Sequence, residues 1–183
     1  IISPHKTIIN CQCKELFQNF CEKNSLPIIP RWDKKTFPFF IKPKKGSSSK
    51  DARLIYNLTQ FKNEVSRYEE FFIKQKYIQG KEYTVDGYID KNNKIKALSP
   101  RERIKTSNGE VEITRTIRDN EIENLSKIII DKFALKGPIS IQFIRSKNDD
   151  KLWLMEINPR LAGGVIASIE AGYNIPEMLI KDI

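Results

Sequence analysis

The segment Leu154–Gly164, "LMEINPRLAGG", decides the fold because it places polar side chains at alternate positions of an apolar strand. Glu156, Asn158 and Arg160 are two residues apart, so on an extended strand they lie on one face. Burying an unpaired carboxylate is strongly unfavourable, and these groups must therefore reach water or face a partner. We expect this face to border a binding site.

The preceding strand is predicted to add a further polar residue to this face. The stretch "ISIQFIRSKNDDKLWLMEIN" is typical of an antiparallel hairpin. Period-two alternation assigns Met155 to the core, and matching it with Phe143 sets Gln142 directly opposite Glu156. This register predicts a turn that is centred on Asp149 and contains an odd number of residues.

The predicted cluster has the chemistry of a cation site. Gln142, Glu156 and Asn158 offer one carboxylate and two amide carbonyl oxygens. Hard cations such as Mg²⁺ prefer oxygen ligands and usually keep waters and substrate phosphates in the remaining positions. The alternative is a solvated strand face on which Glu156 and Arg160 form a surface ion pair.

Composition places the chain among globular proteins. It has 183 residues, of which 39% are apolar and 30% charged. No apolar run approaches the roughly 18 residues of a membrane span, so we expect no membrane anchor. The three cysteines and the lone His5 have no zinc-site spacing, and we expect reduced thiols in a cytoplasmic protein.

The net charge of +9 is concentrated near the start of the chain. Residues 1–50 carry ten Lys or Arg and three acids, which gives +7. A local excess of this kind suits a polyanion such as a nucleoside triphosphate, whereas nucleic-acid binding would favour a longer basic stripe with aromatic residues. A solvated, lysine-rich surface is the alternative.

The apolar periodicities predict an α+β chain in three parts. Residues 1–36 are expected to form one helix or two short ones and a proline-containing connection. Residues 37–78 are predicted to form a small lobe of three strands and one helix, with Thr59 as the helix cap. Residues 79–183 are predicted to form a larger lobe, with a helix capped by Asp119 and the polar hairpin.

Four motifs in this order resemble the ATP-grasp superfamily: "FPFFIKP", "YIQGKEYTVDGYI", "GPISIQFI" and "MEINPR". The resemblance is closest to the ATP-binding domains of the carbamoyl-phosphate synthase large chain and related carboxylate–amine ligases, because glutamine at position 142 is similar to that branch. It implies a two-lobed α+β fold with nucleotide between the lobes. It also implies a missing N-terminal domain, in the same or another chain, from which residues 1–36 would lead.

The resemblance also implies roles for individual residues. Gln142, Glu156 and Asn158 would hold Mg²⁺ or Mn²⁺, and Arg160 and Arg103 would act in catalysis near the phosphates and the acyl-phosphate site. The loop of residues 44–50 would fold over the triphosphate, with a plain surface loop as the alternative. The implied ATP-binding residues are Lys14, Lys42, Gly46, Ser47, Ser48, Ser49, Gln75, Tyr77, Ile78 and Glu82.

The chemistry implied is phosphoryl transfer from ATP to a small-molecule carboxylate, followed by attack of an amine or ammonia on the acylphosphate. In such a transfer the protein mainly positions reactants and stabilises charge. Two other functions stay open: a nucleotide-binding module without catalysis, and a basic domain for nucleic acid or an acidic partner. Nucleic acid and membranes are not expected as partners.

Overall fold

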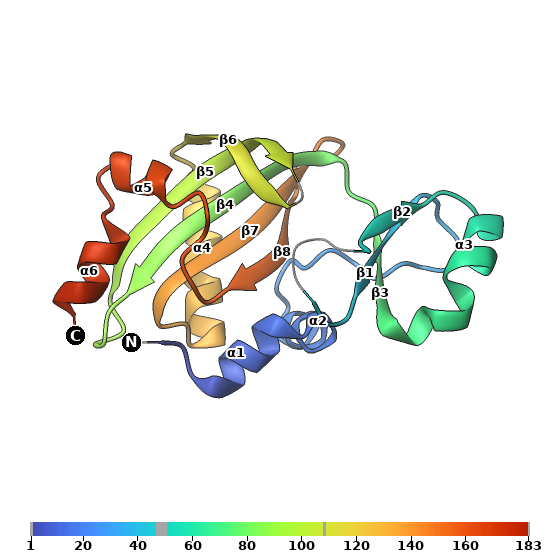
Figure 1. Cartoon of the computed structure of the whole chain (residues 1–183), viewed down its shortest axis with the longest axis horizontal. Helices are drawn as coiled ribbons and strands as arrows, with labels where there is room; N and C mark the ends of the chain where they lie inside the picture. Colours follow the sequence, from blue (N-terminus) through green and yellow to red (C-terminus); the bar gives the residue numbers. More distant parts are fainter. Residues whose placement is uncertain (1, 47–50, 108, 183) are drawn as a thin grey trace.

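The chain folds around two separate antiparallel sheets (Figure 1). The structure, a computed structural model, describes residues 2–46, 51–107 and 109–182. The smaller sheet has the strand order β2-β1-β3. Its strands are β1 (Phe39–Pro43), β2 (Arg53–Ile55) and β3 (Phe72–Lys76).

The larger sheet has the strand order β6-β5-β4-β7-β8. Strands that follow one another in the sequence lie side by side, namely β4–β5, β5–β6 and β7–β8, and β7 returns beside β4 after helix α4. The strands are β4 (Gly80–Ile89), β5 (Ile95–Ser107), β6 (Glu110–Thr116), β7 (Gly137–Ser146) and β8 (Leu152–Asn158). The α+β fold predicted from the sequence is confirmed.

The first helical region is two helices, α1 (His5–Gln12) and α2 (Lys14–Lys23), which are separated by the extended backbone of Cys13. In the small lobe, α3 (Leu58–Glu64) is capped by Asn57, whose side chain accepts from the Gln60 amide. The prediction of Thr59 as the cap was wrong, because the helix begins before Thr59 and asparagine is a strong N-cap residue. A 3₁₀ turn, η1 (Ser66–Phe71), follows.

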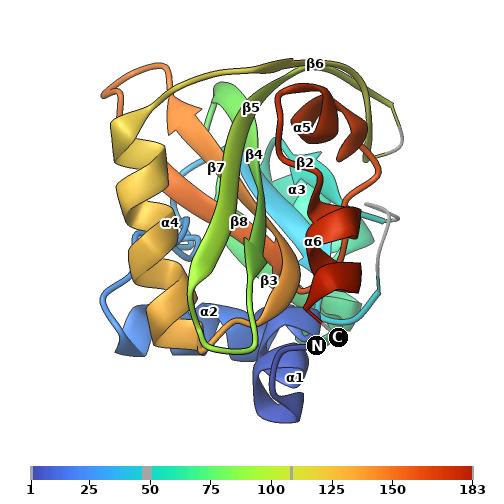
Figure 2. The ribbon, with the colours of Figure 1, turned by 90° about the vertical axis from the view of Figure 1, so that its left-hand side faces the viewer.

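Helices cover both faces of the larger sheet (Figure 2). On one face, α2 and α4 (Asn120–Phe133) enclose the main core, which includes Val85, Ile129 and Leu154, all fully buried. On the other face lie α5 (Ile166–Glu170) and α6 (Ile175–Lys181), and Ile175 packs with Tyr88. Asp119 caps α4 as predicted, accepting from two backbone amides. No helix among the described residues is long and apolar enough to cross a membrane.

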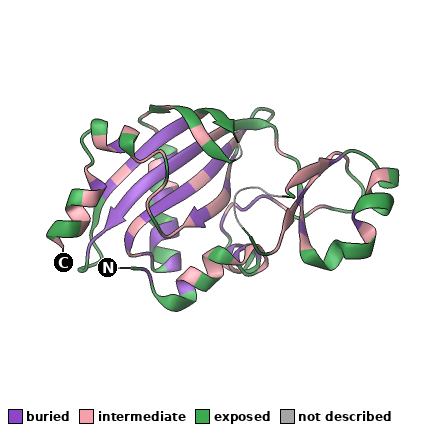
Figure 3. Ribbon diagram, in the orientation of Figure 1, coloured by how far each residue is buried: buried purple, intermediate pink, exposed green. Residues whose placement is uncertain are grey.

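Burial follows the sheets: the central strands are largely buried and the helices are exposed on their outer sides (Figure 3). The small lobe has a core of its own around Phe39, Ile41, Ile55 and Val65. Trp32 closes this core by stacking on Phe39, with ring centroids 3.8 Å apart. Aromatic pairs of this kind add stabilisation beyond the area they bury.

The segment of residues 27–32 is bonded to both sheets. The Leu154 amide donates to the Pro27 carbonyl at 2.7 Å, which attaches the segment to β8. The Trp32 amide donates to the Lys74 carbonyl, and the Lys76 amide donates to the Pro30 carbonyl, which attaches it to β3. The two sheets are therefore connected here as well as through residues 77–79.

The β7–β8 hairpin contains a bulge that the alternation of apolar residues does not predict. Gln142 pairs with Glu156 as expected, but Phe143 pairs with Leu154, so Met155 is an extra residue on β8. The predicted pairing of Phe143 with Met155 was therefore wrong. Beyond the bulge Arg145 pairs with Leu152, so six residues lie between these partners instead of the expected odd number. Met155 is only partly buried and faces the space between the sheets, while Leu154 is fully buried in the core.

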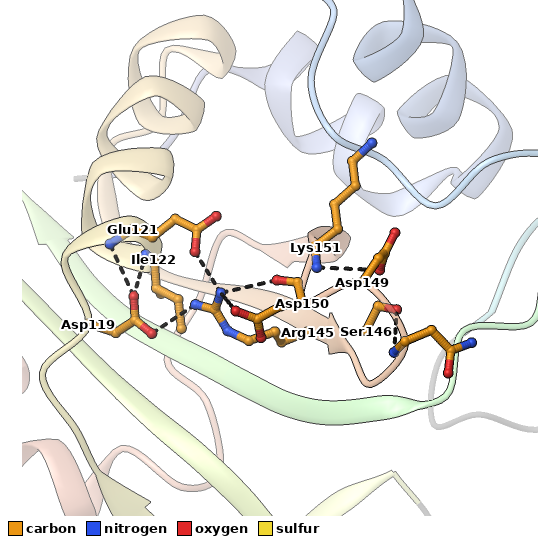
Figure 4. Close-up of polar contacts among 9 residues, drawn as sticks. Asp119, Glu121, Ile122, Arg145, Ser146, Asp149, Asp150 and Lys151 are labelled. Carbon is orange, nitrogen blue, oxygen red and sulfur yellow. Dashed lines mark hydrogen bonds and ion pairs between the residues drawn. The ribbon is translucent and has the colours of Figure 1, made fainter.

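An ion-pair network fastens this hairpin to the start of α4 (Figure 4). The guanidinium of Arg145 donates to Asp119 at 2.8 Å and to Glu121 at 2.6 Å. It also donates to the Asp150 carbonyl at 3.3 Å. Partial burial lowers the pKa of Arg145. The hydrogen bond to Glu121 and the charges of Asp119 and Glu121 raise it by more, so the pKa of Arg145 lies above its ordinary value.

Candidate active site

A cleft of about 820 Å³ lies between the two sheets. It gathers most of the residues singled out in the sequence, from both sheets and from α2. The predicted residues that line it are Lys14, Lys42, Gly46, Gln75, Glu82, Arg103, Gln142, Glu156, Asn158 and Arg160. Tyr77 and Ile78 are not among its lining residues but lie in the connection between β3 and β4, and Ser47, Ser48 and Ser49 lie outside the described residues.

The proposed metal ligands meet on the wall formed by β7 and β8. Gln142 is the cross-strand partner of Glu156, and the Asn158 amide nitrogen donates to Oε1 of Glu156 at 2.8 Å. This bond fixes the amide so that Oδ1 of Asn158 keeps its acceptor capacity. One carboxylate and two amide oxygens fit a hard cation that also takes phosphate oxygens and water.

The alternative interpretation of this face, a surface ion pair between Glu156 and Arg160, is not what the structure shows. Arg160 donates to the Leu161 carbonyl at 2.9 Å, and Glu156 is bonded to Asn158. Among the described residues there is also no group of three or more His, Cys, Asp or Glu side chains that could hold a metal. A cation site in this cleft would therefore depend on amide oxygens, with Glu156 as its carboxylate.

Lys42 faces this wall from the small sheet. Desolvation lowers the pKa of Lys42, and the charges of Glu156 and Glu82 act against that lowering while Lys14 adds to it. An ammonium group that is partly removed from water attracts a phosphate anion more strongly than a solvated one does. Lys14 also reaches the cleft, where its Nζ donates to the Gly46 carbonyl at 2.8 Å.

Gln75 brings an unused acceptor to the small-sheet side of the cleft. The Gln18 amide nitrogen donates to Glu22 at 2.9 Å and to the Ile29 carbonyl at 3.1 Å, so its oxygen is left to accept from Gln75 at 2.8 Å. This network fixes the orientation of the Gln75 amide. Its Oε1 is buried and has no hydrogen-bond partner among the described residues. Such an acceptor suits an amino group of a ligand.

Glu82 and Arg103 form an ion pair on the other wall, with Nε of Arg103 at 3.2 Å from Oε2 of Glu82. They are also direct partners in the β4–β5 ladder. Arg103 donates in addition to the Gly109 carbonyl at 3.0 Å. The pair places a carboxylate and a guanidinium side by side at the cleft surface.

Sequence reasoning missed the buried polar residues deeper in the cleft, namely Thr84, Arg101 and Ser140. In sequence, Arg101 stands in the charged run "SPRER", which is typical of a solvent-exposed segment. The signal that could have found it is the alternation of β5, in which Ser99, Arg101 and Arg103 share one face. The same alternation in β4 gives Glu82, Thr84 and Asp86.

A family model described as "ATP-grasp in the biosynthetic pathway with Ter operon" matches residues 69–183, the part of the chain that contains the larger sheet. The chain belongs to the ATP-grasp superfamily. The ATP-grasp fold expected from the sequence is thereby confirmed.

Relatives with known names agree with this assignment. A D-alanine–D-alanine ligase of Petrotoga mobilis is 26% identical over 194 residues, which cover 90% of this chain and 62% of that protein. This ATP-grasp chain therefore spans about three-fifths of the length of that relative.

Solved structures of low identity share the ATP-grasp fold. N5-carboxyaminoimidazole synthetase from Staphylococcus aureus, complexed with ADP, matches with a TM-score of 0.85 at 21% identity, covering all of this chain and 54% of that one. Biotin carboxylase from Campylobacter jejuni, in a β-γ-ATP complex, matches with a TM-score of 0.83 at 15% identity, covering 99% and 48%. The narrower resemblance to carbamoyl-phosphate synthase stays a prediction.

Proposed function

We propose that this chain is the ATP-binding core of an ATP-dependent carboxylate–amine ligase. The observation that carries the proposal is the arrangement of Glu156, Asn158 and Gln142 on one wall of the cleft, with Lys42 on the facing sheet. The names of its relatives support it: D-alanine–D-alanine ligase and N5-carboxyaminoimidazole synthetase. One relative, a 2-oxoglutarate carboxylase domain, is in complex with ADP and its magnesium salt.

The residues of the cleft divide the work of binding ATP. Lys42 and Lys14 hold phosphate oxygens, since both ammonium groups reach the cleft from the small-sheet side. The free Oε1 of Gln75 accepts from the amino group of adenine, and Glu82 accepts from ribose hydroxyls. The backbone near Tyr77 and Ile78 lies between the two sheets and is proposed to bond the adenine edge.

Gln142, Glu156 and Asn158 would hold Mg²⁺ or Mn²⁺, which neutralises phosphate charge and polarises the phosphoryl group when it is bound. Arg160 and Arg103 orient the oxygens of the transferring phosphoryl group, since each guanidinium presents a forked set of donors. The acceptor carboxylate takes the phosphoryl group, ADP leaves, and an amine or ammonia displaces phosphate from the acylphosphate. The protein supplies position and charge and forms no covalent intermediate.

Partners and location follow from this proposal. The substrates are a small carboxylate and an amine, and a further domain in the same or another chain would complete the enzyme. A carbamoyl-phosphate synthase-like acceptor is the narrower form of the proposal, supported by glutamine at position 142. The expected location is the cytoplasm.

The test combines binding and turnover. ATP affinity is measured by calorimetry with Mg²⁺ and with a chelator, and ADP release is followed across a panel of carboxylates and amines. Mg²⁺-dependent binding with acceptor-dependent ADP release supports the ligase. Binding without ADP release for any acceptor supports a non-catalytic nucleotide module. ATP binding that does not depend on Mg²⁺ and is lost as the salt concentration rises supports the basic binding domain.

A further inference from the structure

Arg101 is a buried arginine beneath the cleft. Its side chain is 1% exposed and pairs with the equally buried Asp86, with Nε at 2.8 Å from Oδ2. Nη2 of Arg101 reaches Oδ1 of Asp86 at 3.5 Å. Ser168 on α5 donates to Oδ2 of Asp86 at 2.7 Å, so the carboxylate is held on two sides. The guanidinium is therefore fixed in position before any ligand enters.

The remaining donor group of this guanidinium is unused. Within the described residues, Nη1 of Arg101 has no hydrogen-bond partner, and the same holds for Oγ1 of Thr84. Both residues are 1% exposed and both line the cleft. Buried polar groups without partners are rare in folded proteins and often mark the place of a bound ligand or water.

The two unused groups belong to adjacent strands and to one row. Arg101 pairs with Thr84, Thr84 with Gln142, and Gln142 with Glu156. Neighbouring strands are about 4.7–4.9 Å apart, so an anion on Arg101 and Thr84 lies two to three strands from the carboxylate of Glu156. Thr84 is the direct cross-strand partner of Gln142, so the two unused donors and the proposed cation ligands lie along one row of the cleft wall.

Gly164 leaves room for Arg101. A β-carbon at this position would lie 2.8 Å from Nη1 of Arg101 and 2.7 Å from Val111. The backbone after β8 can therefore run closely over the guanidinium only because residue 164 has no side chain. Any larger residue would press on the unused donor.

We propose that Arg101 and Thr84 form the subsite that binds the acceptor carboxylate. Nη1–H and the Thr84 hydroxyl donate to its oxygens, and Asp86 with Ser168 positions the guanidinium. Asp86 already balances the charge of Arg101, so the subsite selects by hydrogen bonding and shape. Arg160, which lines the same cleft, adds positive charge. This inference rests on the proposed ligase function, because the row ends at the proposed metal ligands.

The experiment uses [¹³C]acetate as the carboxylate probe, followed by ¹³C NMR line broadening with the whole chain and a non-hydrolysable Mg–ATP analogue. The decisive variant is Thr84→Val, which removes the unused hydroxyl but keeps the shape of the side chain. We expect acetate to bind about tenfold more weakly, as for the loss of one hydrogen bond to a charged group. Thr59→Val, the same change at an exposed position of α3, should leave the broadening unchanged.

Gly164→Ala is the second variant, because replacing Arg101 would leave the buried carboxylate of Asp86 without its cation and endanger folding. Its methyl group should displace Nη1 and abolish acetate broadening. The thermal stability of both variants is measured as well. Thr84→Val should be as stable as the parent or more so, since the hydroxyl has no partner to lose; a large loss of stability would show a structural role and overturn the proposal.

Outcomes for the subsite and for the ligase are separable. If the parent binds Mg–ATP but acetate broadening is missing or is equal in Thr84→Val, the subsite is refuted and the proposed function stands. If Mg–ATP does not bind but acetate depends on Thr84, the ligase proposal fails and the carboxylate site stands. Inorganic phosphate, followed by ³¹P NMR, is the competing probe: if it binds at Thr84 and acetate does not, the site takes phosphate and the carboxylate assignment is overturned.

Discussion

Gln142 lies directly opposite Glu156 in the β7–β8 ladder, while its neighbour Phe143 pairs with Leu154, one residue out of register. The slip makes Met155 the extra residue of a bulge. Bulges often redirect a side chain next to a functional site. Here the bulge turns Glu156 and Asn158 toward the cleft while Leu154 and Ile157 both stay in the core.

Replacing Glu156 with alanine should weaken Mg²⁺-dependent ATP binding without unfolding the protein. Glu156 is the carboxylate of the proposed ligand set, and its removal takes away the charge that holds the cation against the phosphates. Calorimetry of the parent and Glu156→Ala, with Mg²⁺ and with chelator, measures the effect. The exposed Glu70→Ala is the matched control. If the parent and Glu156→Ala bind ATP equally well, both with Mg²⁺ and with chelator, Glu156 is not part of the site.

The bulge predicts unequal costs for two neighbouring truncations. Leu154→Ala should lower the free energy of unfolding by about 2–5 kcal/mol, because it empties a fully buried position. Met155→Ala should cost clearly less, since Met155 lies on the cleft side of the sheet. Urea unfolding of both variants tests this, and a larger loss of stability for Met155→Ala would contradict the bulged register of β8.

Lys42 should make the protein more stable as the pH rises into the alkaline range. Desolvation lowers the pKa of Lys42 below its ordinary 10.5, so between the lowered pKa and 10.5 the unfolded chain binds more protons than the folded one. Stability then increases with pH across that window. Lys42→Met should flatten this slope and stabilise the protein at neutral pH.

The same Lys42→Met change should weaken ATP binding, by roughly tenfold or more, because a charge-assisted hydrogen bond to phosphate is lost. Urea unfolding at several pH values and calorimetry measure the two effects. Lys62→Met, on the exposed surface of α3, is the control for both. If Lys42→Met changes neither the ATP affinity nor the dependence of stability on pH, Lys42 is a solvent-exposed residue outside the site.

Arg145→Met should destabilise the fold and leave ATP binding intact. It removes the bonds to Asp119 and Glu121 that fasten β7 to α4, at a cost of about 1–3 kcal/mol. Arg115→Met removes a more exposed pair with Glu102 and should cost about 0–1 kcal/mol. Chemical unfolding distinguishes the two, and a loss of ATP affinity in Arg145→Met would contradict its purely structural role.

Period-two alternation was enough to predict the meeting of Gln142 with Glu156. It failed at Met155, because a bulge shifts the phase of a strand without any change in composition. The helix cap was misplaced by two residues for a similar reason. Asn57 and Thr59 are both residue types that can cap a helix, and which of them does so depends on where the helix begins.

The rest of the site depends on contacts between distant parts of the chain. The bond from Gln75 to Gln18 joins residues 57 positions apart, and nothing in either segment alone indicates it. Arg101 looks like one residue of a charged run until β4 brings Asp86 against it, and α5 brings Ser168 against Asp86. Burial of this kind is decided by packing and not by local pattern.

The segment of residues 27–32 has a mechanical consequence. It is bonded to β8 at one end and to β3 at the other, and residues 77–79 form a second covalent crossing between the same two sheets. Together with the bond from Gln75 to Gln18 on α2, these attachments restrict sliding and twisting of one sheet against the other, and they favour a hinge motion along this side of the cleft. Prolines 27 and 30 stiffen the first attachment. We therefore expect the cleft to open and close by rotation of the small sheet about this side, with the opposite edge of the cleft moving furthest.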